Sequence, residues 1–360
     1  MNDDLGIYQV LAPSGELVRD LPPELDDDLL TRMYRWMVLT RTLDARMVSL
    51  QRQGRIAFYG PITGQEAATV ASGLAAGESD WIVPALREGV LALVRGLPLV
   101  KALAQFIGNS LDDCRGRQMP CHASFAGKQF VSMSSCIASQ IPHAVGIAMA
   151  ARIRREHAVV LGYLGDGATS EPDFHAGLNF AGVFRAPVVL ICQNNQWAIS
   201  VPVAHQTASE TIAMKGRAYG VPSVRVDGND ALAVHTATRR AVERARKGDG
   251  PTFLELLTYR VGGHTTADDP TRYRDETEVA TWRARDPIKR LRDFLEQRGI
   301  WSSEQETMLN EQLQAEISAA VEEAEKAPPP SPSSLFDDVY HDVPRHLRDQ
   351  REEMRRFIDG

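Results

Sequence analysis

The sequence of 360 residues has little cysteine, no excess of basic charge and no long hydrophobic run. Its four cysteines form no C-x-x-C pair, so we expect reduced thiols and not a disulfide framework. The formal net charge of -7 argues against a general nucleic-acid binder. No apolar run reaches the roughly 18 residues of a membrane span, and the acidic start predicts no targeting segment. These absences favour a soluble cytoplasmic protein that binds neither nucleic acid nor a membrane.

Two common nucleotide-binding signatures are also missing. The chain contains neither G-x-G-x-x-G nor G-x-x-x-x-G-K-[ST]. A nicotinamide-dependent oxidoreductase would need the first of these and a downstream acidic residue, so that alternative has no motif to support it. A zinc site formed by Cys114, Cys121 and His122 is conceivable, although scattered core thiols explain the same cysteines.

The apolar spacing predicts an α/β fold, with a mostly parallel sheet flanked by helices. The expected helices span residues 29–53, 65–76, 141–153, 173–184 and 231–247, and the third of these is expected to be buried on most sides. The expected strands span residues 158–164, 187–192, 223–226 and 252–257. Two short apolar runs flanking a helix are typical of parallel strands joined by a crossover.

Composition divides the chain into three parts. Residues 1–28 hold several prolines among acidic residues and are expected to form an extended arm. Residues 29–300 carry the α/β pattern. Residues 301–360 are expected to be helical, with a stiff Pro/Ser linker at 327–334. The charged tail after this linker is either a solvated helix or a clamp on a partner subunit.

Polar residues follow two consecutive expected strands. Gly165-Asp166-Gly167 comes directly after the first strand, and Asn194-Asn195 follows the second. A right-handed crossover leaves both carboxyl ends at one edge of the sheet, where such folds bind ligands. One carboxylate and one amide oxygen suit Mg²⁺ with phosphate ligands, and glycines let a backbone approach an anion. The pair of motifs therefore predicts a magnesium–diphosphate site, whereas the first motif alone is common in ordinary turns.

Residues 165–175 and 194–200 resemble the paired signature of thiamine diphosphate enzymes. More narrowly, the chain resembles the alpha subunit of the decarboxylating first component of 2-oxoacid dehydrogenase complexes. Further segments match that family in order, at residues 52–59, 116–120, 134–140, 225–230, 259–265 and 335–340. The resemblance covers nearly the whole chain and implies the thiamine diphosphate-binding fold.

The resemblance also assigns site residues. It implies that Mg²⁺ is bound by Asp166, by the side chain of Asn195 and by the backbone carbonyl of Trp197. The positions that match cofactor contacts in the family are Arg87, Ser135, Ile137, Gly165, Asp166, Gly167, Ala168, Asn195, Arg260 and His264. Among these, Ile137 matches the bulky residue that enforces the bent conformation of the cofactor.

His264 matches the catalytic histidine of the family. Its implied roles are to stabilise the oxyanion formed when the cofactor attacks the 2-oxo group and to assist acyl transfer to a lipoyl group. Imidazole suits proton movement near neutral pH, but without the resemblance His264 is one of nine histidines. Asp268 is expected to pair with Arg260 and so to order the loop around His264 when cofactor is bound. Phe58 either lines the acyl pocket or is a core aromatic residue.

Three further residues and one departure complete the comparison. Ser134, Ser139 and Gln140 resemble a structural potassium site, although small residues on a buried loop also explain them. Leu86 stands where the family usually has tyrosine, which removes a phenolic hydrogen bond to phosphate.

The implied activity is oxidative decarboxylation of a 2-oxoacid with reductive acylation of a lipoyl-bearing acyltransferase. In the family a beta subunit supplies the glutamate that activates the cofactor, so we expect an α2β2 heterotetramer. Residues 116–120 and the tail favour a branched-chain substrate of the 2-oxoisovalerate type. Residues 193–195 and 268–274 are also typical of bacterial pyruvate enzymes, and acetoin is a third candidate substrate. A scaffold without activity is the weaker reading, because Asp166, Asn195 and His264 are all present.

Overall fold

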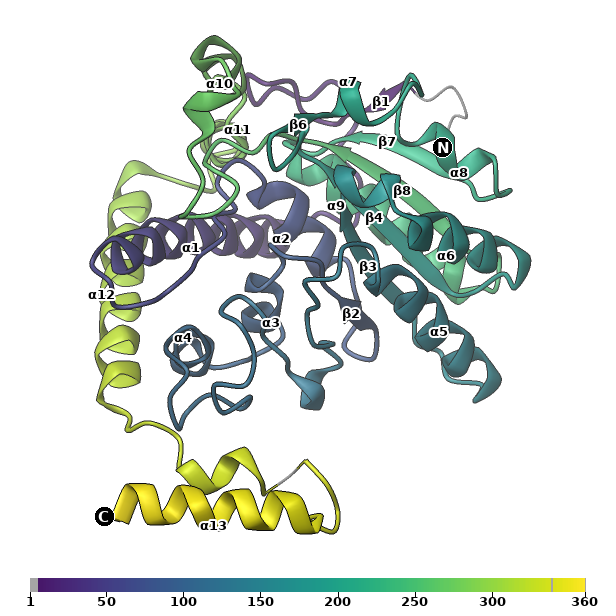
Figure 1. Ribbon diagram of the computed structural model, residues 1–360. Helices are drawn as coiled ribbons and strands as arrows, with labels where there is room; N and C mark the ends of the chain where they lie inside the picture. The colour runs from purple at the N-terminus through teal and green to yellow at the C-terminus, as the bar shows by residue number, and fades with distance from the viewer. Residues whose placement is uncertain (1–5, 338, 360) are drawn as a thin grey trace.

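The computed structural model describes residues 6–337 and 339–359, and a six-stranded sheet lies at its centre (Figure 1). All neighbouring strands of this sheet are parallel, in the order β1-β7-β8-β4-β3-β2. The strands are β1 (Ile7–Tyr8), β2 (Trp81–Val83), β3 (Val160–Gly165), β4 (Val188–Asn194), β7 (Ser223–Asp227) and β8 (Thr252–Leu257). A separate antiparallel pair joins β5 (Trp197–Ala198) to β6 (Val201–Pro202). The predicted α/β class is confirmed.

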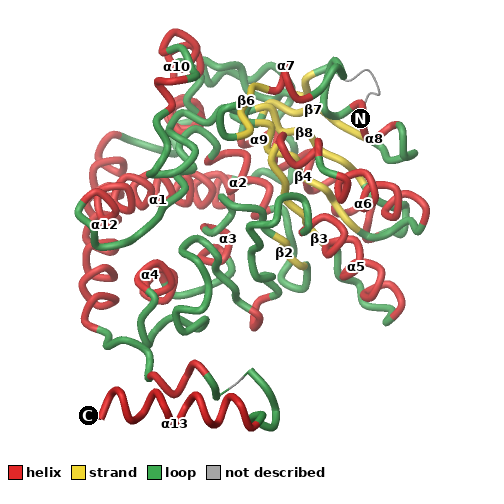
Figure 2. Tube along the Cα trace, viewed as in Figure 1, coloured by secondary structure: helices red, strands yellow, loops and turns green. Residues whose placement is uncertain are grey.

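Helices surround this sheet (Figure 2). They are α1 (Asp27–Arg52), α2 (Glu66–Leu74), α3 (Val90–Val94), α4 (Leu99–Ile107), α5 (Gln140–Ile153), α6 (Pro172–Val183), α7 (Val203–Gln206), α8 (Met214–Arg217), α9 (Ala231–Arg246), α10 (Glu276–Arg283), α11 (Pro287–Gln297), α12 (Ser303–Lys326) and α13 (Arg345–Asp359). Short 3-10 turns occur at η1 (Ala126–Lys128), η2 (Asp166–Ser170), η3 (Pro270–Arg272) and η4 (Pro332–Leu335). Each helix and strand expected from the apolar pattern is present within a few residues of its predicted ends.

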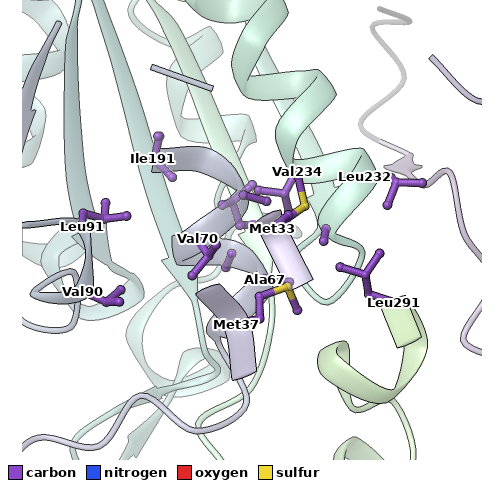
Figure 3. Close-up of a cluster of buried hydrophobic side chains, with 14 of the residues drawn as sticks. Met33, Met37, Ala67, Val70, Val90, Leu91, Ile191, Leu232, Val234 and Leu291 are labelled. Carbon is purple, nitrogen blue, oxygen red and sulfur yellow. The ribbon is translucent and has the colours of Figure 1, made fainter. Parts of the chain in front are cut away.

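The two faces of the sheet are covered by different helices. On one face α5 and α6 pack against alternate residues of β3 and β4, among them Val160 and Leu190. Gly162 allows this close approach, because a Cβ there would lie 2.9 Å from the Cβ of Ala144 in α5. On the other face α2 and α9 lie over the sheet, with α1 and α11 packed behind them. Figure 3 shows this second core, where Met33 and Met37 of α1 meet Val70 of α2 and Val234 of α9.

Helix α5 is less buried than predicted. Ile141, Ala144 and Ala148 are buried, but His143 and Gly146 are exposed and Ile153 is 79% exposed. The small apolar residues of α5 pack against α6 and the strands β2, β3 and β4, so one face of the helix enters the core. The expectation of burial on most sides is therefore wrong.

The N-terminal segment is attached to one edge of the sheet, where β1 is the outermost strand. β1 pairs with β7, and the carboxylate of Asp230 accepts hydrogen bonds from the amides of Val10 and Leu11, both at 2.7 Å. Asp230 also caps α9 through the amides of Leu232 and Ala233. Arg290 of α11 donates to the carbonyl of Leu11 and binds Asp227 at 2.9 Å. One cluster of buried charges therefore joins the start of the chain to two later helices.

The C-terminal helices leave the sheet. α12 packs along α1 and α4, and its residues Leu309, Leu313, Ile317 and Val321 are buried, as their spacing predicts. α13 lies at one end of the molecule beyond α4 (Figure 1). Over the residues that the structure covers, no helix combines the length and the apolar character needed to cross a membrane.

Candidate active site

The carboxyl edge of the sheet brings the two polar motifs together. β3 and β4 are neighbours, with Gly165 opposite Gln193, so the chain leaves both strands at the same edge. Asp166 is 2% exposed and Asn195 is 7% exposed. Burial raises the pKa of Asp166, and its own backbone amide and that of Asn195 are among the groups that lower it. The Asp166 carboxylate therefore lies beside the backbone of Asn195, at the sheet edge where the two residues are predicted to share a ligand.

The loop after β3 is held tightly in place. Gly167 and Ala168 belong to η2, and a Cβ at Gly167 would lie 2.7 Å from the Cβ of Ala198 in β5. The hydroxyl of Thr169 donates to the carbonyl of Asp166 at 2.8 Å, and Lys215 donates to Thr169 at 2.9 Å. This packing fixes the backbone on which the Asp166 carboxylate stands.

The Asp166 carboxylate has the environment of a cation ligand. Its only side-chain donor in the described part of the chain is Gln206, whose Nε2 lies 2.9 Å from Oδ2. No lysine, arginine or histidine nitrogen among residues 6–337 and 339–359 lies within 4.0 Å of it. A buried carboxylate without a cation is costly, and carboxylate oxygens are the ligands that Mg²⁺ prefers. The residue present therefore fits a divalent metal.

The other two predicted metal ligands follow directly in the chain. Asn195 donates from Nδ2 to Oε1 of Gln65 at 2.9 Å, which leaves its oxygen facing only the amide of Trp197 at 3.2 Å. The carbonyl of Trp197 accepts from Nη1 of Arg260 at 3.3 Å. Both oxygens retain lone pairs for a further ligand.

Two arginines and a histidine gather opposite these oxygens. Nη2 of Arg87 lies 2.9 Å from the carbonyl oxygen of His264 and 3.2 Å from its Nδ1. Burial, and then Arg260, lowers the pKa of Arg87 to about 10. Burial, followed by Arg87 and Arg260, lowers the pKa of His264 to about 4. Burial is the main cause of both shifts and the neighbouring arginines add to it, so an anion such as a diphosphate would stabilise the positive charge of these side chains.

The contact with Arg87 fixes the protonation of His264. A guanidinium has only donors, so Nδ1 of His264 must accept the hydrogen bond. With a pKa near 4 the ring is neutral at pH 7, and its single proton therefore sits on Nε2. His264 thus presents an N–H donor that can stabilise an oxygen anion.

The loop that carries His264 is ordered through Tyr273. The backbone amide of His264 donates to Oδ2 of Asp268 at 2.6 Å, and the Tyr273 hydroxyl donates to the same oxygen at 2.5 Å. Arg260 donates to the Tyr273 hydroxyl at 2.8 Å. The Tyr273 hydroxyl therefore bridges Asp268 and Arg260, while their direct pairing in the cofactor-bound loop stays a prediction.

Ser135 has a buried histidine behind it. Nε2 of His122 lies 2.5 Å from the Ser135 hydroxyl, and Nδ1 lies 3.0 Å from the carbonyl of Pro120. A carbonyl only accepts, so Nδ1 carries the proton and Nε2 accepts from the serine. Ile137, two residues later, is 60% exposed, and Phe58 is partly buried.

The predicted potassium residues are close together. The Ser139 hydroxyl lies 3.3 Å from that of Ser134 and 2.7 Å from the carbonyl of Cys136. Gln140 donates to the carbonyl of Tyr163 at 3.1 Å, and its buried Oε1 has no partner. By contrast, no group of three histidine, cysteine or acidic residues in the described chain could hold a metal ion, so the zinc alternative gains no support.

Four side chains that contact the site were given no role in it by the sequence, although His122 was considered as a zinc ligand. They are Gln65, His122, Gln206 and Tyr273, and each contacts a predicted site residue or its loop. None belongs to the two paired motifs, and glutamine in particular has no spacing signature. Only the folded contacts identify them.

Comparisons with known proteins give matches over most of the chain. The model of the family described as "Dehydrogenase E1 component" matches residues 34–333. The "Pyruvate dehydrogenase E1 component subunit alpha" of Staphylococcus aureus is 42% identical over 348 residues, which cover 96% of this chain and 92% of that protein. The "2-oxoisovalerate dehydrogenase subunit alpha 2, mitochondrial" of Arabidopsis thaliana is 41% identical over 355 residues, covering 98% of this chain and 75% of that protein.

Proposed function

Because the chain belongs to the dehydrogenase E1 component family, as a thiamine diphosphate-dependent 2-oxoacid dehydrogenase alpha subunit, we propose that it decarboxylates a branched-chain 2-oxoacid. The acyl group then passes to a lipoyl-bearing acyltransferase. Residues 116–120 and 335–340 support the branched-chain choice through their resemblance to 2-oxoisovalerate enzymes. The observation that supports the cofactor site is the pair of buried arginines, Arg87 and Arg260, together with the buried carboxylate of Asp166 at the same edge of the sheet, with the neutral imidazole of His264 in contact with Arg87.

In this proposal, Asp166, the side chain of Asn195 and the carbonyl of Trp197 hold Mg²⁺. Arg87 and Arg260 bind the diphosphate, while Gly165, Gly167, Ala168, Ser135 and Ile137 shape the rest of the cofactor site. When bound, thiamine diphosphate supplies the nucleophilic carbon and the electron sink that decarboxylation needs. Ser134, Ser139 and Gln140 hold K⁺, for which the unpaired Oε1 of Gln140 is a ready ligand.

His264 acts on the substrate in its neutral form. Its Nε2–H donates to the oxygen of the 2-oxo group as negative charge develops there, which stabilises the transition state. Burial strengthens this donor because little water competes with it. Asp268, which accepts from the Tyr273 hydroxyl, also accepts from the backbone amide of His264. These hydrogen bonds fix the loop and keep the imidazole ring of His264 oriented toward the site.

The partners follow from family membership. As an alpha subunit of a 2-oxoacid dehydrogenase complex, the chain works with a beta subunit and with the other components of the complex. We propose an α2β2 heterotetramer with the cofactor between alpha and beta, and with Ile137, exposed in the isolated chain, covered by beta. The C-terminal helix α13 is proposed to clamp that partner.

The experiment is to co-express the chain with candidate beta subunits and to compare 2-oxoisovalerate with pyruvate. The expected result is a higher kcat/KM for 2-oxoisovalerate; a preference for pyruvate would contradict the substrate choice. His264→Ala should retain cofactor-dependent thermal stabilisation of the complex and lose reductive acylation of a lipoyl domain by about 10²- to 10⁴-fold. Full turnover in that variant would remove His264 from the mechanism.

Pyruvate is the second candidate. It is favoured by the Staphylococcus aureus relative, which is as similar to this chain as the Arabidopsis thaliana relative is. Acetoin is a third candidate, which the same comparison can include. A nicotinamide-dependent oxidoreductase has neither a motif nor the family in its favour.

A further inference from the structure

Helix α1 carries a buried carboxylate that none of the roles proposed above uses. Asp44 is 1% exposed. Its Oδ1 accepts from the amide of Ile62 at 3.0 Å, and its Oδ2 accepts from the amide of Thr63 at 3.0 Å and from the Thr63 hydroxyl. All three donors belong to one short segment, residues 59–63, so Asp44 fixes that segment to α1.

The segment has no regular structure of its own. Residues 53–65 lie between α1 and α2 and contain neither a helix nor a strand. Directly after residues 59–63, Gly64 has a φ of +99°, and a Cβ there would lie 2.5 Å from the carbonyl oxygen of Tyr259. The backbone at this point therefore packs against the chain that leaves β8, and its place depends on the contacts that hold it.

The same segment is hydrogen-bonded to the loop that carries Arg260 and His264. The amide of Val261 donates to the carbonyl of Thr63 at 3.1 Å, and the amide of Thr266 donates to the carbonyl of Tyr59 at 2.9 Å. The amide of Tyr59 donates in turn to the Thr266 hydroxyl at 3.2 Å. Residues 59–63 therefore hold the loop on both sides of its histidine.

Arg87 is held by this segment as well. Its Nη1 donates to the carbonyl of Pro61, while its Nη2 donates to the carbonyl of His264 at 2.9 Å. Burial and then Arg260 lower the pKa of Arg87, and Asp44 is the foremost of the charges that raise it. Asp44 thus favours the charged form of an arginine that it does not touch.

We propose that Asp44 is a positioning residue, which sets the places of Arg87 and of the loop that carries Arg260 and His264. The inference rests on the proposed function of these three side chains. Asp44 acts through residues 59–63, which are fixed before a ligand arrives, so less order has to be gained when the cofactor binds. A carboxylate is suited to this role because it offers only acceptors, whereas an amide would turn an NH2 group toward an N–H donor.

The test compares Asp44→Asn with the same change at Asp80. Asp80 is also completely buried, and it accepts from the amides of Gly77 and Val159 at the opposite edge of the sheet. In the co-expressed αβ complex, Asp44→Asn should lower the affinity for thiamine diphosphate with Mg²⁺ about 10- to 100-fold, and Asp80→Asn less than about 3-fold. Isothermal calorimetry measures the affinity, and urea denaturation shows that both variants are folded.

Hydrogen exchange measures the link itself, without cofactor or substrate. The peptide of residues 259–268 contains the amides of Val261 and Thr266, which bind the segment. Their exchange should be at least about 10-fold faster in Asp44→Asn and unchanged in Asp80→Asn. Mass spectrometry of the αβ complex gives these rates.

A milder pair of variants changes only the hydroxyl bond. Thr63→Val removes the donor to Asp44 and keeps the shape of the side chain, and should lower the cofactor affinity about 3- to 10-fold. Thr63→Ser keeps the donor and should restore the affinity of the unaltered complex. Size-exclusion chromatography checks assembly of every variant, and if Asp44→Asn does not assemble, this pair decides the proposal.

Two results would overturn the proposal. One is an equal loss of cofactor affinity in Asp44→Asn and Asp80→Asn, which would give Asp44 a structural role only. The other is unchanged exchange of the loop amides in Asp44→Asn. If the unaltered complex bound no thiamine diphosphate, the proposed function would fall, while the exchange rates would still decide whether Asp44 holds the loop.

Discussion

Two arginines of this protein are almost completely buried, yet their surroundings differ. Arg290 is 1% exposed and binds Asp227 at 2.9 Å, with Asp230 at 3.6 Å. Arg260 is 0% exposed and contacts the carbonyls of Trp197 and Ile199 and the hydroxyl of Tyr273. No carboxylate within the described residues lies within 4.0 Å of Arg260.

The difference separates a structural charge from a functional one. Two carboxylates neutralise Arg290, and the group joins the N-terminal arm to α9 and α11. Burial is the main cause that lowers the pKa of Arg260, and Asp268 and Asp166 offset it only at longer range. A buried cation without an anion destabilises the fold, and such sites are retained where a ligand supplies the missing charge. The four predictions below test this contrast.

The largest effect is expected from Asp166→Ala. This change removes the carboxylate that is proposed to hold the metal near the buried arginines. Affinity for thiamine diphosphate in the presence of Mg²⁺ should fall by more than about 100-fold, while the fold is retained. Isothermal calorimetry on the αβ complex measures the affinity and circular dichroism checks the fold. Unchanged affinity would contradict the metal assignment.

Arg290→Met tests the structural arginine. Removing one member of a buried ion cluster leaves Asp227 and Asp230 without their cation, and costs about 3–5 kcal/mol of the free energy of unfolding. Urea denaturation of the complex measures the loss, and cofactor affinity should stay unchanged. A loss below about 1 kcal/mol would show that this cluster is not needed for stability.

Arg260→Met tests the arginine of the proposed cofactor site. This change leaves no carboxylate unpaired, so the free energy of unfolding should fall by less than it does in the Arg290→Met variant. Cofactor affinity should fall about 10- to 100-fold. Arg260→Lys keeps the charge but not the forked geometry, and should recover part of the affinity. Stabilisation by cofactor in thermal unfolding gives the affinity. A loss of stability equal to that of the Arg290→Met variant would contradict the assignment of Arg260 as a functional and not a structural arginine.

The smallest effect concerns two buried histidines. Burial, as the main cause, lowers the pKa of both His264 and His235 to about 4, below the unfolded value near 6.5. The unfolded chain therefore binds protons that the folded chain does not, and stability falls as the pH drops from 6.5 toward 4. His264→Gln and His235→Gln should each remove up to about 2 kcal/mol of this fall between pH 7 and pH 5.

Thermal unfolding at several pH values measures this fall. Cofactor should reduce the acid sensitivity due to His264, because its negative charge favours the protonated ring, and leave that due to His235 unchanged, because His235 lies in α9. An equal response of the two histidines to cofactor would place the anion elsewhere.

Much of the fold follows from periodicity alone. The buried strands β3, β4 and β8 are continuous apolar runs, and α1, α9 and α12 have clear apolar spacing, so their positions could be predicted. β1 and β2 have two and three residues, which is too short for a periodic signal. The short helix α3 and the longer helices α4, α10 and α11 were not predicted either.

The candidate site divides in the same way. Asp166 and Asn195 could be placed together because parallel strands bring their ends to one edge. The bridge through Tyr273 and the His122–Ser135 contact could not, because they join loops whose relative position depends on packing elsewhere. The roles of Arg87 and His264 came from the family resemblance, and their 3.2 Å contact came only from the fold.

The attachment of β1 has a consequence for synthesis. A ribosome makes residues 7 and 8 well before their partner strand, residues 223–227, and before Arg290, which holds the arm. The segment that contains β1 therefore stays unpaired until most of the chain has been synthesised. Because pairings between residues far apart in the sequence form slowly, the β1 edge of the sheet is among the last parts of the protein to fold.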